Sequence, residues 1–422
     1  MKWFKKIKAG ALQFVLFIGA IVALLLLAFV LVSYSHNLFL KKTDVLVEII
    51  QAVDSGLEYS FTQNMVEGQE LNVPIKSDLG ISVSVEKKYW GVMEIRKTKA
   101  RKGKLNFEKL GFVGHADENR AALYLQDRQR PLVLAGNARI TGTAHLPEQG
   151  VKTGNISGNG YYASQLIYGM EKRSGELLPA FDEEVNQQIV KLTSDGFEPQ
   201  GEEILFKVGM VLKNSFKEPT KVIKGSHILL ERVELSGNII IWATHKISVG
   251  ATSKLHDVIL LAPKIEVERF SKGNFQALAK ESITVGKDCE LDYPTILYVR
   301  QSEPKKEDSR DLEPYISINS NSNIKGMVIY GHEGEETNRF KPDIRIDDNA
   351  SVTGEVHCSG NLELKGYVKG SVTTGGFVAL ENGNIYQNHI YNGSINSMLL
   401  PIEFAGIKYE AKPLNQVAKW LY

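Results

Sequence analysis

Two short stretches in the C-terminal half of the chain hold its densest groups of ionisable residues. They are residues 331–336, with the sequence GHEGEE, and residues 343–348, with the sequence DIRIDD. In the second, Asp343, Arg345 and Asp347 alternate with isoleucines and would share the outer face of a strand. Carboxylates and bases on one face could act as acid and base in cleaving a polysaccharide. The alternative is a set of solvated edge charges, which we expect here, and we assign no catalytic residue.

Residue patterns that hold metals or nucleotides are missing from the sequence. The nine histidines form no H-E-x-x-H or H-x-H motif, and no C-x-x-C occurs. No phosphate-binding glycine loop is present either. We therefore expect no metal site and no cofactor-binding site. The pair His357-Cys358 would have one residue outside a strand and one inside.

Three consecutive segments of 18 residues, between Ile247 and Arg300, align without a gap. They read ISVGATSKLHDVILLAPK, IEVERFSKGNFQALAKES and ITVGKDCELDYPTILYVR. Apolar or small residues recur in pairs at columns one and three, seven and nine, and thirteen and fifteen. Residues two apart lie on the same face of a strand, so each segment predicts three short strands that form one coil of a parallel β-solenoid.

A second block continues the pattern. Residues 344–346 (IRI) are followed 18 residues later by residues 362–364 (LEL), and residues 352–356 (VTGEV) are followed 16 residues later by residues 368–372 (VKGSV). These V-x-G-x-V steps resemble the bactofilins, a family of bacterial cytoskeletal polymers. The resemblance covers roughly a quarter of the chain and implies a right-handed β-solenoid. Bactofilins themselves are cytoplasmic.

Glycine and asparagine lie where the coils must turn. Such residues take left-handed corners or allow close backbone approach, and they include Gly142, Gly158, Gly237, Gly250, Gly286, Gly326, Gly354, Gly370, Asn319 to Asn323, Asn382 to Asn384 and Asn392. An upstream echo, Ile140-Thr141-Gly142 and Ile156-Ser157-Gly158, predicts an early coil. The two cysteines, Cys289 and Cys358, fall on inward positions and predict buried thiols. The alternative is one long-range disulfide.

Residues 10–33 carry no ionisable side chain. This run is long enough to cross a bilayer core of about 30 Å, so it predicts a transmembrane helix. A cleaved signal peptide would have a shorter apolar region, and cleavage after Ser35 is the alternative. Lysines 2, 5, 6 and 8 precede the run, and only Lys41 and Lys42 follow nearby, which favours a cytoplasmic N-terminus. In a bacterium, the rest of the chain would then lie on the periplasmic side of the inner membrane.

Helical spacing continues beyond this run. Val45, Ile49 and Val53 form an apolar stripe, and Gly56 weakens its far end. Alternating residues at 81–85 and onward predict antiparallel strands that pack on the helix.

This layout of a basic leader, a spanning helix and a sheet resembles type IV pilins and minor pseudopilins. The fifth residue after Gly10 is Val15, where prepilins carry glutamate. The resemblance implies an accessory role in a type IV pilus or type II secretion system.

A helix and a covered face are expected around the main repeats. Residues 181–184 (FDEE) open a stretch with Val185, Ile189 and Leu192 at helical spacing. Column fourteen of the repeats would point apolar residues outward, namely Leu260, Leu278 and Ile296. This face is covered by the helix or by the membrane-proximal domain, since large exposed apolar patches are uncommon. The alternative is a partner or self-association surface.

Charge runs and the C-terminus complete the pattern. Lys97, Lys99, Arg101, Lys102 and Lys104 form a basic hairpin tip that could contact anionic headgroups or cell-wall polymer, or be a solvated loop. Residues 303–311 carry both signs and predict a linker that separates the two repeat blocks. Leu414, Val417, Trp420 and Leu421 have helical spacing and could cap the last coil.

The composition, with 43% hydrophobic and 23% charged residues and a net charge of +1, is that of a globular protein and excludes a polyelectrolyte binder such as a nucleic-acid protein. The predicted fold is mainly β: a single N-terminal transmembrane helix, a small α/β membrane-proximal domain and a large parallel right-handed β-solenoid. The expected segments are a basic leader (1–9), the transmembrane helix (10–33), the α/β domain (34–130), early coils (131–163), a partly helical insertion (164–220), 18-residue repeats (221–300), a charged linker (301–315), a bactofilin-like solenoid (316–400) and a C-terminal cap (401–422).

We expect a non-enzymatic, membrane-anchored scaffold of the bacterial cell envelope. Its partners would be the membrane, through residues 10–33, and itself or envelope assembly proteins. The alternatives are the pilus or secretion accessory, and a β-helix protein that binds or cleaves envelope polysaccharide.

Overall fold

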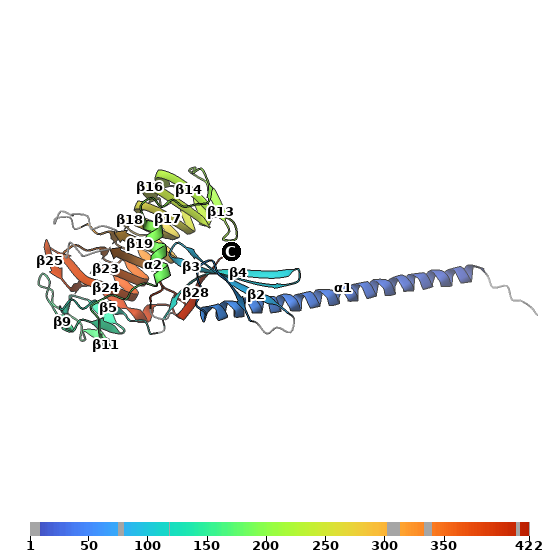
Figure 1. Cartoon of the computed structure of the whole chain (residues 1–422), viewed down its shortest axis with the longest axis horizontal. Coiled ribbons are helices and arrows are strands. Elements are labelled where there is room, and N and C mark those ends of the chain that lie inside the picture. Colours follow the sequence, from blue (N-terminus) through green and yellow to red (C-terminus); the bar gives the residue numbers. More distant parts are fainter. Residues whose placement is uncertain are drawn as a thin grey trace, which may run out of the picture. The chain divides into compact units, whose positions relative to one another are not determined.

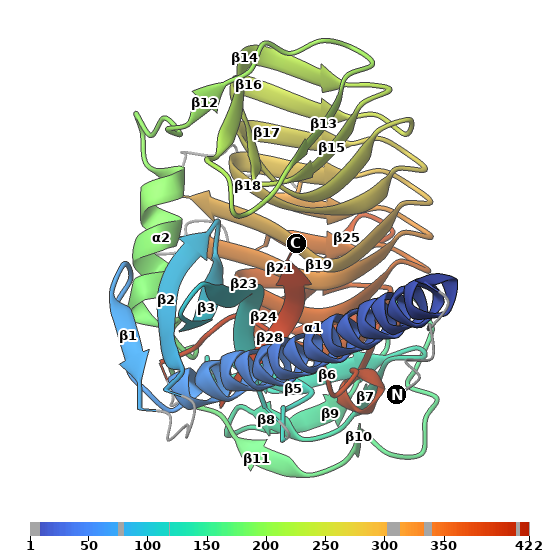
Figure 2. The ribbon, with the colours of Figure 1, turned by 90° about the vertical axis from the view of Figure 1, so that its right-hand side faces the viewer.

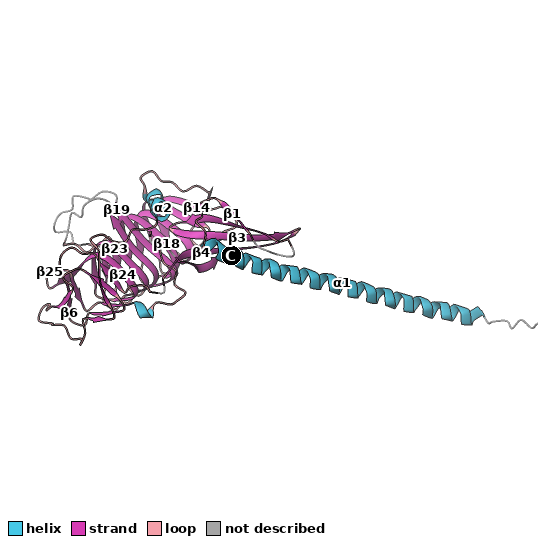
Figure 3. Cartoon of the chain, turned by 60° about the horizontal axis from the view of Figure 1, so that its bottom comes forward, coloured by secondary structure: helices cyan, strands magenta, loops and turns pink. Residues whose placement is uncertain are grey.

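The computed structural model describes residues 9–74, 80–117, 119–301, 313–332, 340–410 and 414–421. The chain is mainly β, with one long helix at its N-terminus (Figures 1 and 3). It divides into two compact units, Met1–Glu86 with Lys97–Lys109 and Lys87–Arg96 with Leu110–Tyr422. The predicted boundary at residue 130 differs from this division, because strands of the expected α/β domain continue into the second unit.

Helix α1, Ala9–Phe61, begins with an exposed apolar segment and ends in a packed one. It is long and apolar enough to cross a membrane, as a membrane anchor or a signal sequence would be. The predicted continuation is confirmed: Ile49 and Val53 are fully buried, in a cluster with Val83. Gly56 does not end the helix. A Cβ there would lie 2.5 Å from a methyl group of Val83, so this glycine allows the strands to pack closely on α1.

The strands that follow α1 form an antiparallel meander. They are β1 (Glu70–Val73), β2 (Ser82–Trp90), β3 (Met93–Lys102) and β4 (Leu105–Ala116), and the fifth strand of their sheet is β28 (Leu414–Leu421). The C-terminal segment is therefore a strand, and the predicted helical spacing there is wrong. It pairs antiparallel with residues 110–116 of β4 and does not cap the last coil, because this ladder decides the conformation of a short apolar segment.

In the second unit, long strands stack in parallel, each on the one before (Figure 2). These strands are β14 (Lys221–Leu230), β16 (Ile239–Val249), β17 (Lys254–Val267), β18 (Lys272–Val285), β19 (Glu290–Gln301), β21 (Asn323–His332), β23 (Ser351–Leu364) and β24 (Tyr367–Glu381). Short strands lie beside them: β15 (Glu234–Gly237), β20 (Ile316–Ile318), β22 (Ile344–Ile346), β25 (Asn384–Gln387), β26 (His389–Tyr391) and β27 (Ser394–Asn396), followed by the 3-10 helix η1 (Ser397–Leu399).

Residues that share a predicted column mostly pair with one another in neighbouring strands. Ile247 pairs with Ile265 and Ile265 with Ile283, and the 16-residue step pairs Val352 with Val368. The prediction that column fourteen points outward is only partly right. Leu278 and Ile296 lie in the apolar cluster on the outer face of the strands, whereas Leu260 lies in the cluster on the inner face. The ladder shifts register between His256 and Val258, where Asp257 has a φ of 57°. This single irregular residue shifts the strand by one position, so the side chains after it point to the faces opposite to those that the repeat predicts.

The two repeat blocks form one continuous stack. Val285 pairs with Ile318, and Val299 pairs with Tyr330. The predicted separation of the two blocks by a linker is therefore wrong. The charged run itself, residues 303–311, lies outside the described residues.

The strands of the segment predicted as an early coil stack at the C-terminal end of the repeats (Figure 2). Its strands are β5 (Leu123–Leu125), β6 (Leu132–Ala135), β7 (Arg139–Thr141), β8 (Ala144–Leu146), β9 (Val151–Thr153), β10 (Ile167–Tyr168) and β11 (Glu171–Arg173). Ile140 pairs with Ile395 on one side and Ile167 on the other. The predicted equivalence with Ile156 is wrong, because Ile156 makes an isolated bridge to Asn159.

The predicted insertion contains one helix, α2 (Glu183–Thr193), as expected. The Asp182 carboxylate caps it by accepting hydrogen bonds from the backbone N–H groups of Glu184 and Val185. The chain then reaches the opposite end of the stack through β12 (Glu202–Glu203) and β13 (Val211–Asn214). The insertion thus links the two ends of the stack.

Two apolar clusters lie on the two faces of the stacked strands. The inner cluster contains the isoleucine and valine columns together with Cys289 and Cys358, which are both buried thiols and form no disulfide with each other, as predicted. The outer cluster joins Leu278 and Ile296 to Val185 and Ile189 of α2. Trp90 of β2 and Phe112 of β4 belong to it as well. The predicted cover over this face is confirmed, and both proposed elements contribute.

The backbone turns where the sequence pattern places them at most of the predicted positions. Positive φ angles occur at Gly142, Gly158, Gly237, Gly326, Gly354, Gly370, Asn321, Asn382 and Asn392. At Gly250 and Gly286 the backbone is not left-handed, and a side chain would instead meet backbone or side-chain atoms of the neighbouring coil.

Candidate functional site

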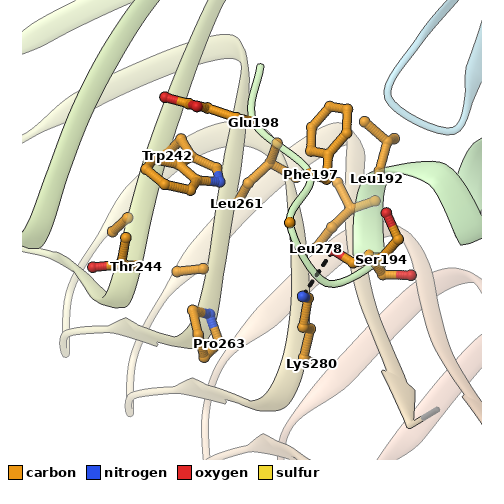
Figure 4. Close-up of a pocket in the computed structure, with 14 residues that line it drawn as sticks. Leu192, Ser194, Phe197, Glu198, Trp242, Thr244, Leu261, Pro263, Leu278 and Lys280 are labelled. Carbon is orange, nitrogen blue, oxygen red and sulfur yellow. Dashed lines mark hydrogen bonds between the residues drawn. The ribbon is translucent and has the colours of Figure 1, made fainter.

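A groove of about 310 Å³ lies beside the C-terminal end of α2, on the outer face of the stacked strands (Figure 4). Trp242, Leu261 and Leu278 come from three neighbouring strands, β16, β17 and β18. Leu192 and Phe197 face them from α2 and the turn after it. We call this feature the Trp242 groove.

Strand alternation places the tryptophan in the groove. Ile241 and Ala243 point into the inner cluster, so Trp242 between them points outward. The register pairs Trp242 with Leu261 and Leu261 with Leu278, which makes an apolar stripe across three strands. Helix α2 covers the stripe further along, and the groove is the part that it leaves partly open.

A lysine holds the turn that forms one wall. Lys280 Nζ donates to the Ser194 carbonyl at 2.9 Å and to the Asp195 carboxylate at 2.7 Å. The carbonyl is that of the residue that caps the C-terminus of α2, where a cation interacts favourably with the helix dipole. The hydrogen bond from Lys280 also holds the pKa of the exposed Asp195 carboxyl below its usual value.

The rim of the groove is polar, and its charges are paired. Glu198 accepts a hydrogen bond from Lys224 Nζ at 2.6 Å, and Thr244 adds a hydroxyl group. A concave apolar surface with an aromatic face and a few polar groups suits the binding of a ring. The carboxylate that lines it, on Glu198, has a lysine partner, so the arrangement favours binding over acid-base turnover.

A second group of functional side chains is buried where β2 and β3 meet the C-terminal segment. The Glu94 carboxylate accepts hydrogen bonds from Arg96 and Lys408, and Lys87 lies 3.9 Å from it. Lys87 also bonds Glu184 at the start of α2. The side chain of Glu94 is 1% exposed. Burial alone would raise the pKa of Glu94, but Lys408 and Arg96 hold it below the usual value.

His357 and Cys358 alternate as predicted. Cys358 points into the inner cluster, while His357 points outward beneath Phe181 and Tyr409. Burial lowers the pKa of His357 to about 4, so its imidazole is neutral at pH 7. A cavity of about 150 Å³ beside Tyr409 is lined by Arg120 and Glu355, which form an ion pair.

The acidic candidates have structural partners where they are described. Ile344 and Ile346 point inward, as predicted, and put Asp343, Arg345 and Asp347 outside. Asp343 accepts a hydrogen bond from the Asn361 backbone N–H at 2.7 Å, and Arg345 donates to Glu363 at 2.8 Å. Burial raises the pKa of Asp347. Residues 333–336 of the other acidic group lie outside the described residues. Across the described ranges, no three metal-ligating side chains gather.

The sequence interpretation missed both sites for different reasons. The sequence does contain a signal for Trp242. It follows the run Ile239-Ile240-Ile241 at an outward position, and it pairs with the outward Leu261 of the next long strand. Glu94 has none, because Lys408 is 314 residues away along the chain.

Comparisons with protein-family models, with curated proteins and with solved structures gave no match. The geometry described above therefore carries the functional argument.

Proposed function

We propose that this chain is a non-enzymatic scaffold of a bacterial cell envelope, anchored in the inner membrane by α1. Its stacked strands would be the coils of a right-handed β-solenoid that presents binding surfaces on the periplasmic side. One observation carries the proposal: the exposed apolar segment and the packed residues Ile49 and Val53 belong to one unbroken helix, α1. The four lysines before residue 10 support a cytoplasmic N-terminus.

The ends of the stack argue for lateral contacts and against growth into a filament. At one end the terminal strands are β12, whose two residues Glu202 and Glu203 are both exposed, and β13, whose four residues include the exposed Val211 and Lys213. At the other end β11 presents Glu171, Lys172 and Arg173, all exposed. Short, charged edge strands oppose edge-to-edge pairing. A scaffold that resembles bactofilin coils would therefore act as a capped unit.

Membrane anchoring is tested by placing charges in α1. Replacing Ala23 and Leu27 with arginine puts two cations near the centre of the apolar segment, at a cost of about 2.5–3.5 kcal/mol each. We expect the natural protein to stay in the membrane fraction after alkaline carbonate extraction and the double variant to be released. Replacing the exposed Leu46 and Val47 with arginine is the matched control and should leave retention unchanged.

Protease treatment of spheroplasts tests the sidedness in the same strain. Digestion of a C-terminal tag only after the outer membrane is opened supports the periplasmic assignment. A natural protein that carbonate releases, and whose mature N-terminus follows Ser35, would instead show that α1 is a signal sequence.

A second candidate function is the binding of envelope polysaccharide, favoured by the aromatic face of the Trp242 groove. Replacing Trp242 with alanine should weaken binding to a soluble cell-wall glycan on the order of tenfold. Calorimetry on the detergent-solubilised full-length protein measures this, and Trp420→Ala, which removes a partly exposed tryptophan from β28, is the control. Equal affinities for both variants and the natural protein, or no binding at all, would remove this candidate.

A third candidate is an accessory role in a pilus or secretion system. It is favoured by the packing of the C-terminal end of α1 against antiparallel strands, as in the layout that resembles pilins. Crosslinking of the tagged protein in its native envelope, followed by mass spectrometry, separates the candidates. Recovery of pilin-like components supports the accessory role, whereas recovery of the protein itself supports a self-associating scaffold.

A further inference from the structure

The basic hairpin tip has the predicted form. Strands β3 and β4 are joined by a turn at Gly103, which has a φ of 58°. Lys99, Arg101 and Lys104 are exposed, and Lys102 is half-buried. Among the described residues, none of these four cations has a carboxylate within ion-pair distance. The fifth, Lys97, pairs with Glu108 at 3.4 Å.

The tip lies along α1, on the side of the apolar segment. Within the first unit, Gly56 lies against Thr98, whereas the cluster nearer the tip joins Ala100 and Leu105 to Ile49 and Val45 of the helix. Moving along β3 toward the tip therefore means moving toward the N-terminus of α1. Figure 1 shows the hairpin running beside the helix in this direction.

The helix itself fixes the distance of the tip from the apolar segment. Exposed apolar residues continue to Leu38, Phe39 and Leu40, and Lys41 and Lys42 follow directly. This is the sequence of an interface, in which lysines reach the headgroup layer. Val45 is three residues beyond Lys42, or about 4.5 Å along the helix. A tip beside Val45 is thus within about one Debye length, roughly 8–10 Å, of the headgroups.

The charges in this zone have one dominant sign. The zone contains six cations, namely Lys41, Lys42 and the four of the tip. It contains two exposed carboxylates of the helix, those of Asp44 and Glu48. Other carboxylates nearby are already engaged, since Asp54 binds Lys109 at 2.5 Å. The described residues of the zone therefore carry a net positive charge at the height where lipid phosphates lie.

We infer that the tip of the β3–β4 hairpin binds the anionic headgroups of the bilayer in which α1 is anchored. Arg101, Lys102 and Lys104 provide the contact, and Lys41 and Lys42 extend it on the helix. Binding there would hold the first unit at a fixed height and orientation on the membrane surface. The inference rests on the proposed anchoring by α1, and its partner is an anionic lipid surface, attracted by charge.

Headgroup quenching of a fluorophore near the tip tests the inference on the full-length protein in vesicles. A cysteine replaces the exposed Asn106, which the label can modify selectively because Cys289 and Cys358 are both buried. The vesicles contain a headgroup spin-labelled lipid in phosphatidylcholine, with or without phosphatidylglycerol. We expect stronger quenching with phosphatidylglycerol, and loss of this difference at high salt.

Charge removal at the tip supplies the decisive comparison. In the variant Arg101→Gln, Lys102→Gln, Lys104→Gln, we expect the lipid-dependent difference to disappear. The matched control, Lys152→Gln, Lys172→Gln, Lys207→Gln, removes three exposed cations from the second unit and should keep the difference. Equal quenching in both lipids by the natural protein, or an unchanged difference in the tip variant, would overturn the inference.

A second label separates failure of the tip from failure of the anchor. A fluorophore at Ser35→Cys should be quenched in every vesicle, because that position lies six residues before Lys41, about 9 Å along the helix from the headgroup layer. Quenching at Ser35 without lipid dependence at Asn106 refutes the tip contact and leaves the anchor standing. Absence of quenching at Ser35 refutes both.

Discussion

Replacing Gly354 with alanine is expected to lower the free energy of unfolding by about 4 kcal/mol or more, which is enough to unfold many domains. Gly354 has a φ of 147°, a region that residues with a side chain rarely adopt. A Cβ there would also collide with the carbonyl oxygen of Gly326 on the neighbouring strand β21. Gly370 makes the same approach to Gly354, so the ladder cannot yield on either side. Thermal unfolding of the detergent-solubilised protein, followed by circular dichroism, measures the loss.

Substitutions at two other glycines separate the cost of the positive φ from the cost of the collision between backbones. Gly383 has a φ of 76° but open space around it, so Gly383→Ala should cost only the backbone term, about 1–2 kcal/mol. Gly160 has open space and an ordinary φ, and Gly160→Ala should change stability by about 0.5 kcal/mol or less. Similar unfolding temperatures for all three variants would contradict the role of the stacked glycine backbones.

Local patterns made the strands and their parallel registers predictable. Each pair of isoleucines or valines two residues apart is an inward pair of one strand, and equal spacing makes equal registers, as Val352 and Val368 show. The helices were readable for the same reason: α1 from its uncharged run, and α2 from its acidic opening and the helical spacing of Val185, Ile189 and Leu192. These features depend on neighbours along the chain.

The order of the stacked strands was not predictable, because it depends on contacts between distant residues. Ile140 pairs with Ile395 although 255 residues separate them, and only the fold shows that β7 pairs with β27. The reversal of faces after Asp257 depends on a single left-handed residue. The C-terminal strand depends on its partner β4, since its spacing fits a helix equally well.

The Trp242 groove depends both on the local repeat pattern and on contacts between residues that are distant in the sequence. Its floor is an outward apolar stripe that the repeats contain, whereas its wall is the turn after α2, fixed by Lys280 at 2.9 Å from the Ser194 carbonyl. A sequence could therefore suggest an apolar outer face but not where that face stays open.

Replacing Glu94 with glutamine is expected to lower the free energy of unfolding by about 3–5 kcal/mol. Lys87, Arg96 and Lys408 would remain buried around a neutral amide, and their side chains are only 8%, 2% and 8% exposed. Adding Lys408→Met should restore part of the loss, because it removes one of the uncompensated charges. Urea unfolding of the full-length protein, monitored by tryptophan fluorescence, gives the free energies.

An exposed ion pair supplies the control for this prediction, and pH supplies a second readout. Glu148 and Arg173 are 64% and 65% exposed, so Glu148→Gln should cost about 1 kcal/mol or less.

The pKa of Glu94 is held below its usual value of 4.5 in the folded protein, so its carboxylate contributes stability above pH 4.5. That contribution is lost as the pH falls through the folded pKa. The natural protein should therefore lose stability below pH 4.5 more steeply than Glu94→Gln, and parallel curves would show that the cluster does not depend on an ionised Glu94.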